Sequence, residues 1–140
     1  HYSMMSVPDI TRLGWSRAGK EAFNSAGLEP KDINIAETYD SYPVFPLIQL
    51  EAMGFCERGK AGRFVLEGNT SPGGCLPMCT NGGLLCQGHV GAGGGTALLV
   101  EAIRQLKGEA GERQVQGAKT AMMTEVGGQY MDAHVMILGT

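Results

Sequence analysis

The chain has 140 residues, of which 43% are apolar and 18% charged, with a formal net charge of −3. This length provides one hydrophobic core of ordinary size and is too short for two, so we expect a single domain over residues 1–140. Lysine and arginine are scattered, which argues against nucleic acid or an anionic membrane as a partner. No apolar run approaches the roughly 18 residues of a membrane span. The start at His1 lacks signal-peptide features, so we expect a cytoplasmic protein.

Glycine is the compositional outlier, because its 22 residues are about twice the usual share. The glycines concentrate between Gly54 and Gly95 without the three-residue period of collagen, which excludes a fibre and indicates loops. Four cysteines and eight methionines do not make a disulfide scaffold in a chain of this size. They are typical of an enzyme in a reducing compartment.

The first third of the chain predicts a helix, a strand and a second helix. Apolar residues recur at helical spacing over 10–26, and Gly27 supplies a stop. Alternating apolar and polar residues predict a short strand over 33–37, which ends in the polar residues 38–40. A second apolar face at helical spacing predicts a helix over 41–53. Because strand ends are common places for functional residues, positions 38–40 are candidates for a site.

The middle of the chain has no sustained pattern. From residue 55 to residue 95, glycines, prolines and polar residues interrupt every apolar run, and only 63–66 and 84–85 have an ordered pattern of their own. A loop this long inside a compact domain is usually functional.

The last third predicts a helix over 96–107 that ends at Gly108, followed by strands over 118–126 and 133–138. The order of the elements indicates an α/β fold in which helices cover a mixed sheet.

Two glycine-rich motifs resemble nucleotide-binding loops but lack essential features. Gly54 to Lys60 has the spacing of a phosphate loop, yet Ala61 stands where a serine or threonine holds magnesium, and a predicted helix precedes the motif. The segment from Gly88 to Gly95 lacks the dinucleotide-binding spacing because Thr96 replaces the third glycine. We therefore expect a helix cap and a turn at the first motif and no Rossmann cofactor at the second.

Three cysteines and a histidine are candidates for a metal site. Cys75, Cys79, Cys86 and His89 could supply three thiolates and an imidazole to a tetrahedral zinc. Their irregular spacing lacks the tight pair that a structural zinc usually has, which favours free cysteines and no metal. A zinc-stapled interaction domain is the alternative.

His89 is the first candidate for acid–base or oxyanion chemistry. It lies between Gly88 and Gly91, directly before a predicted helix, so its ring projects from a backbone that a ligand can approach closely. The helix dipole favours a developing oxyanion and a neutral imidazole that donates its N–H. The alternative is a histidine that caps a loop.

Tyr39 and Glu125 are the other candidates. Tyr39 follows a predicted strand, although a buried tyrosine with one hydrogen bond is common in a core. Glu125 follows an apolar run, where an unpaired carboxylate is costly to bury, although it could also lie exposed at a hairpin. His134 alternates with apolar neighbours, which indicates a surface residue or a satisfied core residue.

Four ordered blocks of sequence resemble the C-terminal half of thiolases, particularly those of the lipid-transfer-protein type. The resemblance runs from Pro8 to Leu138, and the blocks are Glu37 to Tyr42, Asn81 to His89, Ile103 to Gly111 and Glu125 to Gly128. It implies one of the two similar α/β halves of such enzymes, so the chain would be a fragment or one part of a longer two-half enzyme. The nucleophilic cysteine of that family belongs to the other half.

The resemblance also implies roles for five residues. His89 matches a histidine that binds the thioester oxygen in an oxyanion hole, with Gly88 beside it. Tyr39 stands where true thiolases have asparagine or histidine, and Glu125 stands in place of their second acid–base cysteine. Gly127 matches a glycine whose backbone N–H lines an oxyanion hole.

These departures resemble the aldolase subgroup, which splits β-hydroxyacyl-CoA side chains, such as those of steroids, by retro-aldol cleavage. The implied partners are an acyl-CoA substrate, an N-terminal thiolase half, a second copy in a homodimer core and a DUF35-type protein with an OB-fold and a zinc ribbon. No cofactor is expected besides the acyl-CoA. The alternative activity is that of a degradative thiolase, which cleaves a 3-ketoacyl-CoA with CoA.

Overall fold

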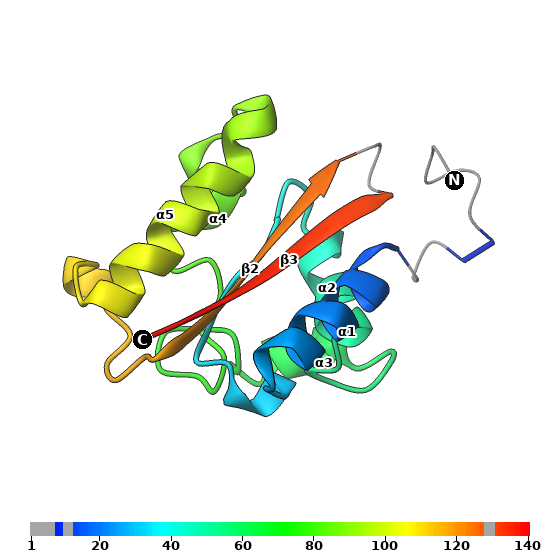
Figure 1. Ribbon diagram of the computed structural model, residues 1–140, viewed down its shortest axis with the longest axis horizontal. Coiled ribbons are helices and arrows are strands. Elements are labelled where there is room, and N and C mark those ends of the chain that lie inside the picture. The colour runs from blue at the N-terminus through cyan, green and yellow to red at the C-terminus, as the bar shows by residue number, and fades with distance from the viewer. Residues whose placement is uncertain (1–7, 10–12, 128–130) are drawn as a thin grey trace.

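A computed structural model describes residues 8–9, 13–127 and 131–140 of the chain. One mixed sheet with the order β1-β2-β3 forms its centre (Figure 1). Strand β1 (Ile35–Glu37) runs parallel to β2 (Thr120–Gly127), and β2 pairs antiparallel with β3 (Asp132–Gly139). The prediction of an α/β fold with a mixed sheet is confirmed.

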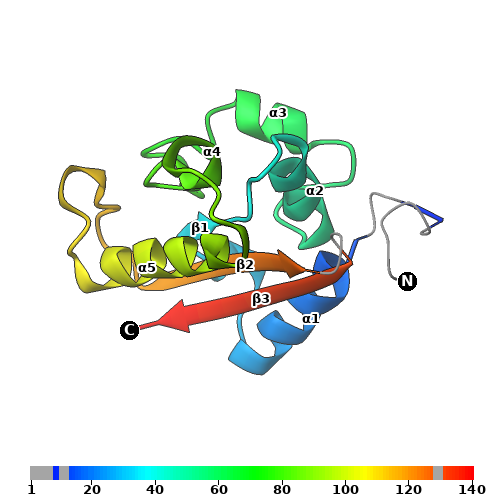
Figure 2. The ribbon, with the colours of Figure 1, turned by 90° about the horizontal axis from the view of Figure 1, so that it is seen from above.

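Helices cover both faces of this sheet (Figures 1 and 2). Helix α5 packs against β1 and β2, and α1 packs against β3 from the opposite face. The α-helices are α1 (Trp15–Ala26), α2 (Val44–Ala52), α3 (Ala61–Leu66), α4 (Gly83–Gln87) and α5 (Gly94–Lys107). Among the described residues, no helix is long and apolar enough to cross a membrane.

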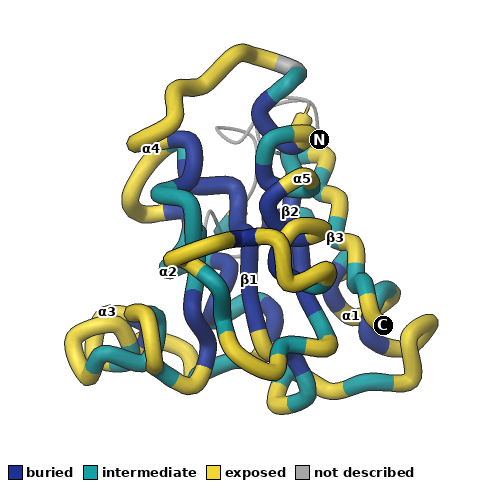
Figure 3. Tube along the Cα trace, turned by 90° about the vertical axis from the view of Figure 1, so that its left-hand side faces the viewer, coloured by how far each residue is buried: buried dark blue, intermediate teal, exposed yellow. Residues whose placement is uncertain are grey.

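The buried core follows from the alternation of side chains along β2. Met122 packs with Phe23, Leu50 and other apolar residues of the α1 and α2 face. Its neighbour Met123 points the other way and packs with Tyr39 and other residues near the end of β1. Figure 3 shows β1 and β2 as the buried centre, and it shows the segment after α4 as exposed.

Two helices end where the sequence predicts, but they begin elsewhere. Gly27 and Gly108 adopt left-handed φ values of 66° and 73°, which favour glycine and end α1 and α5. Helix α1 begins at Trp15 rather than at residue 10; residues 10–12 lie outside the described part of the chain. Helix α5 begins at Gly94, two residues before the predicted start.

The irregular middle segment contains two short helices at the two places where its local pattern indicates order. Helix α3 covers the predicted 63–66, and α4 covers 84–85. Between them the chain runs beside β1, where Ala36 and Met78 form an isolated parallel bridge. This contact brings the residues that follow Met78 to the end of β1.

The segment with phosphate-loop spacing is a helix cap and a turn, as predicted. Its Gly54 and Gly59 have positive φ values of 81° and 78°. The Glu51 side chain accepts a hydrogen bond from the Ala61 N–H at 3.1 Å. Backbone hydrogen bonds, first from Gly59, lower the pKa of Glu51. Backbone amides that a bound phosphate would need are therefore occupied by the protein's own carboxylate.

Candidate active site

The structure brings Tyr39 and His89 into direct contact. Tyr39 lies just past the end of β1 and is 6% exposed, whereas His89 lies in the exposed segment after α4. The hydroxyl oxygen of Tyr39 is 2.6 Å from Nε2 of His89. Their rings meet edge to face, with centroids 5.6 Å apart and an interplanar angle of 88°. A buried phenol is therefore paired with an accessible imidazole.

A backbone contact determines which nitrogen of His89 carries the proton. The Gly91 N–H donates to Nδ1 at 3.0 Å, so Nδ1 is an acceptor and has no hydrogen of its own. In the neutral ring the hydrogen is then on Nε2, which donates it to the Tyr39 oxygen. The hydroxyl hydrogen of Tyr39 remains available for another acceptor.

Glu125 reaches the same region from β2. A β-carbon added at Gly95, in the first turn of α5, would overlap the Glu125 carboxylate. A β-carbon at the adjacent Gly94 would lie 3.7 Å from Nε2 of His89. Glu125 and His89 therefore both approach the first turn of α5, where the absence of a side chain at Gly95 leaves room for the Glu125 carboxylate.

The surroundings of Tyr39 raise the pKa of its hydroxyl. Burial is the largest cause, and the negative charge of Glu125 adds to it, against a smaller lowering effect of Ser41. Tyr39 is therefore a phenol rather than a phenolate at neutral pH.

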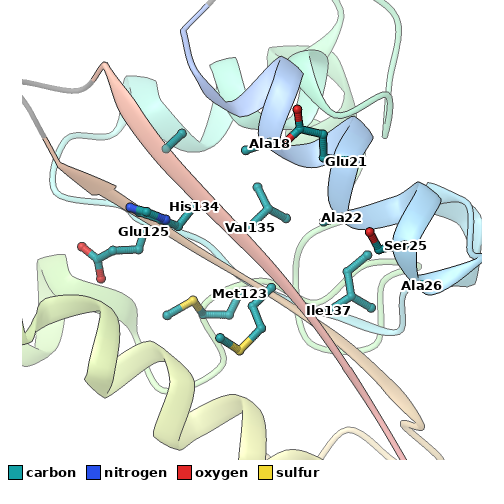
Figure 4. Close-up of a pocket in the computed structure, with 12 residues that line it drawn as sticks. Ala18, Glu21, Ala22, Ser25, Ala26, Met123, Glu125, His134, Val135 and Ile137 are labelled. Carbon is teal, nitrogen blue, oxygen red and sulfur yellow. The ribbon is translucent and has the colours of Figure 1, made fainter. Parts of the chain in front are cut away.

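A groove along the outer edge of β3 gives access to Glu125. Figure 4 shows this groove, whose volume is about 750 Å³, between small residues of α1 and the side chains of β2 and β3. Glu125 and His134 lie side by side at one end of it, because they are partners in the β2–β3 ladder. His134 is exposed, which is the first of the two alternatives that the sequence leaves open. Its position beside Glu125 does not follow from the sequence pattern and comes from the pairing of β2 with β3.

The two candidate backbone residues lie next to these side chains. Gly88 ends α4 with a φ of 97°, which favours glycine, and its N–H donates to the Leu84 carbonyl at 3.0 Å. Gly127 is the exposed last residue of β2, two positions after Glu125. Gly88 thus sets the backbone conformation before His89. Its own N–H already donates to the Leu84 carbonyl.

Asp40 connects the end of β1 to α4. Its carboxylate accepts hydrogen bonds from the N–H groups of Leu84 at 2.7 Å and Leu85 at 3.4 Å. A side chain at Gly83 would overlap this carboxylate, so the close approach requires glycine there. Because Asp40 follows Tyr39 and α4 precedes His89, this anchor holds the two candidate residues together.

A buried acidic network lies beneath the site. The Thr80 hydroxyl oxygen is 2.7 Å from Oε1 of Glu37 and 3.0 Å from Oε1 of Glu101. Arg113 donates to both oxygens of Glu101, at 3.2 and 3.0 Å. The Thr80 hydroxyl has one hydrogen and can donate it to only one of these two carboxylates. If Glu37 carries a proton, Glu37 donates to the Thr80 oxygen and Thr80 donates to Glu101. In agreement, burial raises the pKa of Glu37 to about 7.

The three cysteines that could bind zinc with His89 have separate surroundings. The Cys75 thiol donates to Oδ1 of Asn69 at 3.3 Å, and the Cys79 thiol contacts Thr38. Cys86 is exposed, and burial raises the pKa of Cys79 to about 12. Within residues 8–9, 13–127 and 131–140, no group of three or more metal-binding side chains forms a cluster. In the described part of the chain, these four side chains do not converge on one site.

Residues 1–140 match a family model described as Thiolase C-terminal domain-like. The chain belongs to this family. It is 39% identical over 121 residues to an acetyl-CoA acetyltransferase of Methanothermobacter thermautotrophicus, an alignment that covers 86% of this chain and 32% of that protein. It is 37% identical over 110 residues to the 17-hydroxy-3-oxo-4-pregnene-20-carboxyl-CoA lyase of Mycobacterium tuberculosis, covering 76% of this chain and 28% of the lyase.

A solved structure has the same fold. The Ltp2-ChsH2(DUF35) aldolase matches with a TM-score of 0.85 and 32% identity, covering 96% of this chain and 34% of that one. The thiolase-like C-terminal fold and the resemblance to the lipid-transfer-protein type are therefore confirmed. The chain spans about a third of the length of these relatives.

Proposed function

We propose that this chain is the C-terminal half of a two-half enzyme that cleaves a β-hydroxyacyl-CoA with a steroid-like side chain by a retro-aldol reaction. The contact between the Tyr39 hydroxyl and Nε2 of His89, at 2.6 Å, carries the proposal. A phenol backed by an imidazole is suited to hydrogen bonding and proton transfer at oxygen, which retro-aldol cleavage requires. The similarity to a steroid-CoA lyase and to an aldolase supports the same activity.

In this mechanism Tyr39 and His89 stabilise the enolate. Because His89 donates its Nε2 hydrogen to the Tyr39 oxygen, the Tyr39 hydroxyl hydrogen is free to point at the thioester oxygen of the substrate. Negative charge develops on that oxygen when the Cα–Cβ bond breaks. The donor chain from His89 through Tyr39 then strengthens in the transition state. The backbone N–H of Gly127 is a second proposed donor to this oxygen.

Glu125 is the proposed base. It removes the proton of the substrate's β-hydroxyl group, the C–O bond becomes a carbonyl, and the electron pair of the Cα–Cβ bond moves into the enolate. Glu125 then returns the proton to Cα, which gives the shorter acyl-CoA. The proton count balances, and neither a cofactor nor a covalent intermediate is needed. The exposed His134 beside Glu125 supplies a neighbouring group for proton exchange.

The proposed enzyme needs further protein around this site. Apolar side chains are exposed on the outer surface of α5, at Val100 and Ile103, and near the site, at Leu85 and Val90. Such a surface supports contact with another protein segment, for which we propose the N-terminal thiolase half. We also propose that the enzyme has a homodimer core, that it binds a DUF35-type partner and that it is cytoplasmic. The solved aldolase is itself a complex with a DUF35 protein.

A degradative thiolase is the second candidate function, and the acetyl-CoA acetyltransferase relative favours it. A thiolase cleaves a 3-ketoacyl-CoA and consumes free CoA, whereas retro-aldol cleavage consumes none. By the resemblance, Tyr39 stands where true thiolases have asparagine or histidine, and Glu125 stands where they have a cysteine. Both departures favour the aldolase.

The test is product analysis with the complete enzyme, including both halves and the DUF35-type partner. We expect a β-hydroxyacyl-CoA with a steroid-like side chain to give a shorter acyl-CoA and a carbonyl product, detected by liquid chromatography and mass spectrometry, without added CoA. Turnover that is confined to a 3-ketoacyl-CoA and that requires free CoA would contradict the aldolase and support the thiolase.

A further inference from the structure

Three hydrogen bonds form a closed ring around the backbone of Tyr39. The Tyr39 N–H donates to the Thr124 hydroxyl oxygen at 2.7 Å. The Thr124 hydroxyl donates to Oε1 of Gln49 at 2.5 Å, and Nε2 of Gln49 donates to the Tyr39 carbonyl at 2.8 Å. Gln49 and Thr124 are fully buried. The ring joins the end of β1 to α2 and β2 in the interior.

The ring lies beyond the last residue pair between β1 and β2, where the strands no longer pair with each other. The last residue pair between β1 and β2 is Glu37 with Met123, so Tyr39 lies beyond the ladder. Its N–H and carbonyl would be unpaired in the core without other partners, which destabilises the folded state. The side chains of Thr124 and Gln49 provide those partners.

The ring also has only one possible direction. A backbone N–H can only donate and a backbone carbonyl can only accept, so the Thr124 oxygen must accept from Tyr39 and Nε2 of Gln49 must donate to it. The single hydrogen of the Thr124 hydroxyl is then committed to Oε1 of Gln49. A substitution that keeps the volume but changes one donor or acceptor breaks the ring.

We propose that Gln49 and Thr124 are positioning residues that hold Tyr39 in register with His89 and Glu125. The inference rests on the proposed function. Thr124 is the residue before Glu125 in β2, so one residue orients the backbone of the proposed enolate donor and the strand that carries the proposed base. Displacement of reacting groups by about 1 Å can cost about 100-fold in rate.

The test uses three conservative variants of the complete enzyme. Thr124→Val removes the hydroxyl at constant shape, Gln49→Met removes the donor to the Tyr39 carbonyl at similar volume, and Thr124→Ser keeps every hydrogen bond. We expect the first two to lower kcat about 10- to 100-fold with KM changed less than about threefold, and Thr124→Ser to stay near wild type. Met122→Leu, at a buried neighbour outside the ring, is the control for lost packing.

A second readout does not depend on activity. Nitrogen NMR of His89 reports whether Nε2 still donates to Tyr39, and we expect this signal to shift in Thr124→Val and Gln49→Met but not in Met122→Leu. Lower thermal stability with unchanged kcat and an unchanged His89 signal in folded Thr124→Val or Gln49→Met would overturn the inference. If the wild-type enzyme cleaves no β-hydroxyacyl-CoA, the proposed function fails, and the His89 signal still decides whether the ring positions Tyr39.

Discussion

The Tyr39 hydroxyl and Nε2 of His89 lie 2.6 Å apart, although 50 positions separate the residues in the sequence. The first belongs to the buried end of β1 and the second to the exposed segment after α4. Asp40 bridges these two elements by accepting hydrogen bonds from the first turn of α4. The pairing is therefore a product of the fold around it, and substitutions in that fold test it.

Gly95→Ala should lower activity without lowering stability. The added methyl group would overlap the Glu125 carboxylate, which is the flexible end of a side chain and can move away. Alanine favours the helix over glycine by up to about 1 kcal/mol, so the fold should persist. We expect kcat to fall at least about tenfold while the melting temperature stays equal or rises. Steady-state kinetics and thermal melting measure both.

Gly62→Ala is the matched control for this change. Gly62 lies in α3, and a β-carbon there would meet nothing within 4 Å. Its activity should equal that of the wild type. Equal activity in both variants would show that the close approach of Glu125 to Gly95 has no part in the reaction.

The tautomer of His89 is directly measurable. The Gly91 N–H occupies Nδ1, so the neutral ring should carry its proton on Nε2. Proton–nitrogen correlation spectra should show a protonated Nε2 and an unprotonated Nδ1. In Tyr39→Phe the Nε2 hydrogen loses its acceptor, and its resonance should move. A proton on Nδ1 in the resting enzyme would contradict the donor chain from His89 to Tyr39.

Stability should depend on pH through Glu37. Burial raises the pKa of Glu37 from 4.5 to about 7, so the folded state binds more protons than the unfolded state between these values. The free energy of unfolding should therefore fall as the pH rises through this window, by about 3 kcal/mol. Urea titrations at several pH values measure this slope.

Two variants separate the effect of Glu37 from that of other carboxylates. Glu37→Gln keeps the volume and cannot ionise, so the decline between pH 4.5 and 7 should disappear. Glu67→Gln removes an exposed carboxylate that pairs with Arg63, and the decline should remain. A decline of the same size in Glu37→Gln would show that another group causes it.

Local signals predicted the elements well because the residues that end them act locally. Gly27 and Gly108 end helices through their own left-handed φ values. Glycine after a helical pattern predicts such an end from the sequence alone. The early start of α5 could not be predicted, since Gly94 and Gly95 are glycines for a tertiary reason. Gly95 leaves room for the Glu125 carboxylate, and a β-carbon at Gly94 would be tight against Leu84.

The candidate site was predictable only in part. Resemblance to thiolases singled out Tyr39, His89 and Glu125, and the structure brings these three together. Sequence patterns did not reveal Gln49 or Thr124, because their roles depend on where α2 crosses the sheet and on how β2 is aligned with β1. Such relationships exist only after folding.

The turnover of Tyr39→Phe is the most direct test of the account. The change removes one oxygen and keeps the ring, so the loss of its hydrogen bond should cost no more than about 1 kcal/mol of stability. Met122→Leu, at a buried position outside the site, is the control. For the complete enzyme acting on a β-hydroxyacyl-CoA, we predict that kcat falls at least about 100-fold in Tyr39→Phe and is unchanged in Met122→Leu. Wild-type turnover by a folded Tyr39→Phe enzyme would contradict the proposed role of the Tyr39 hydroxyl.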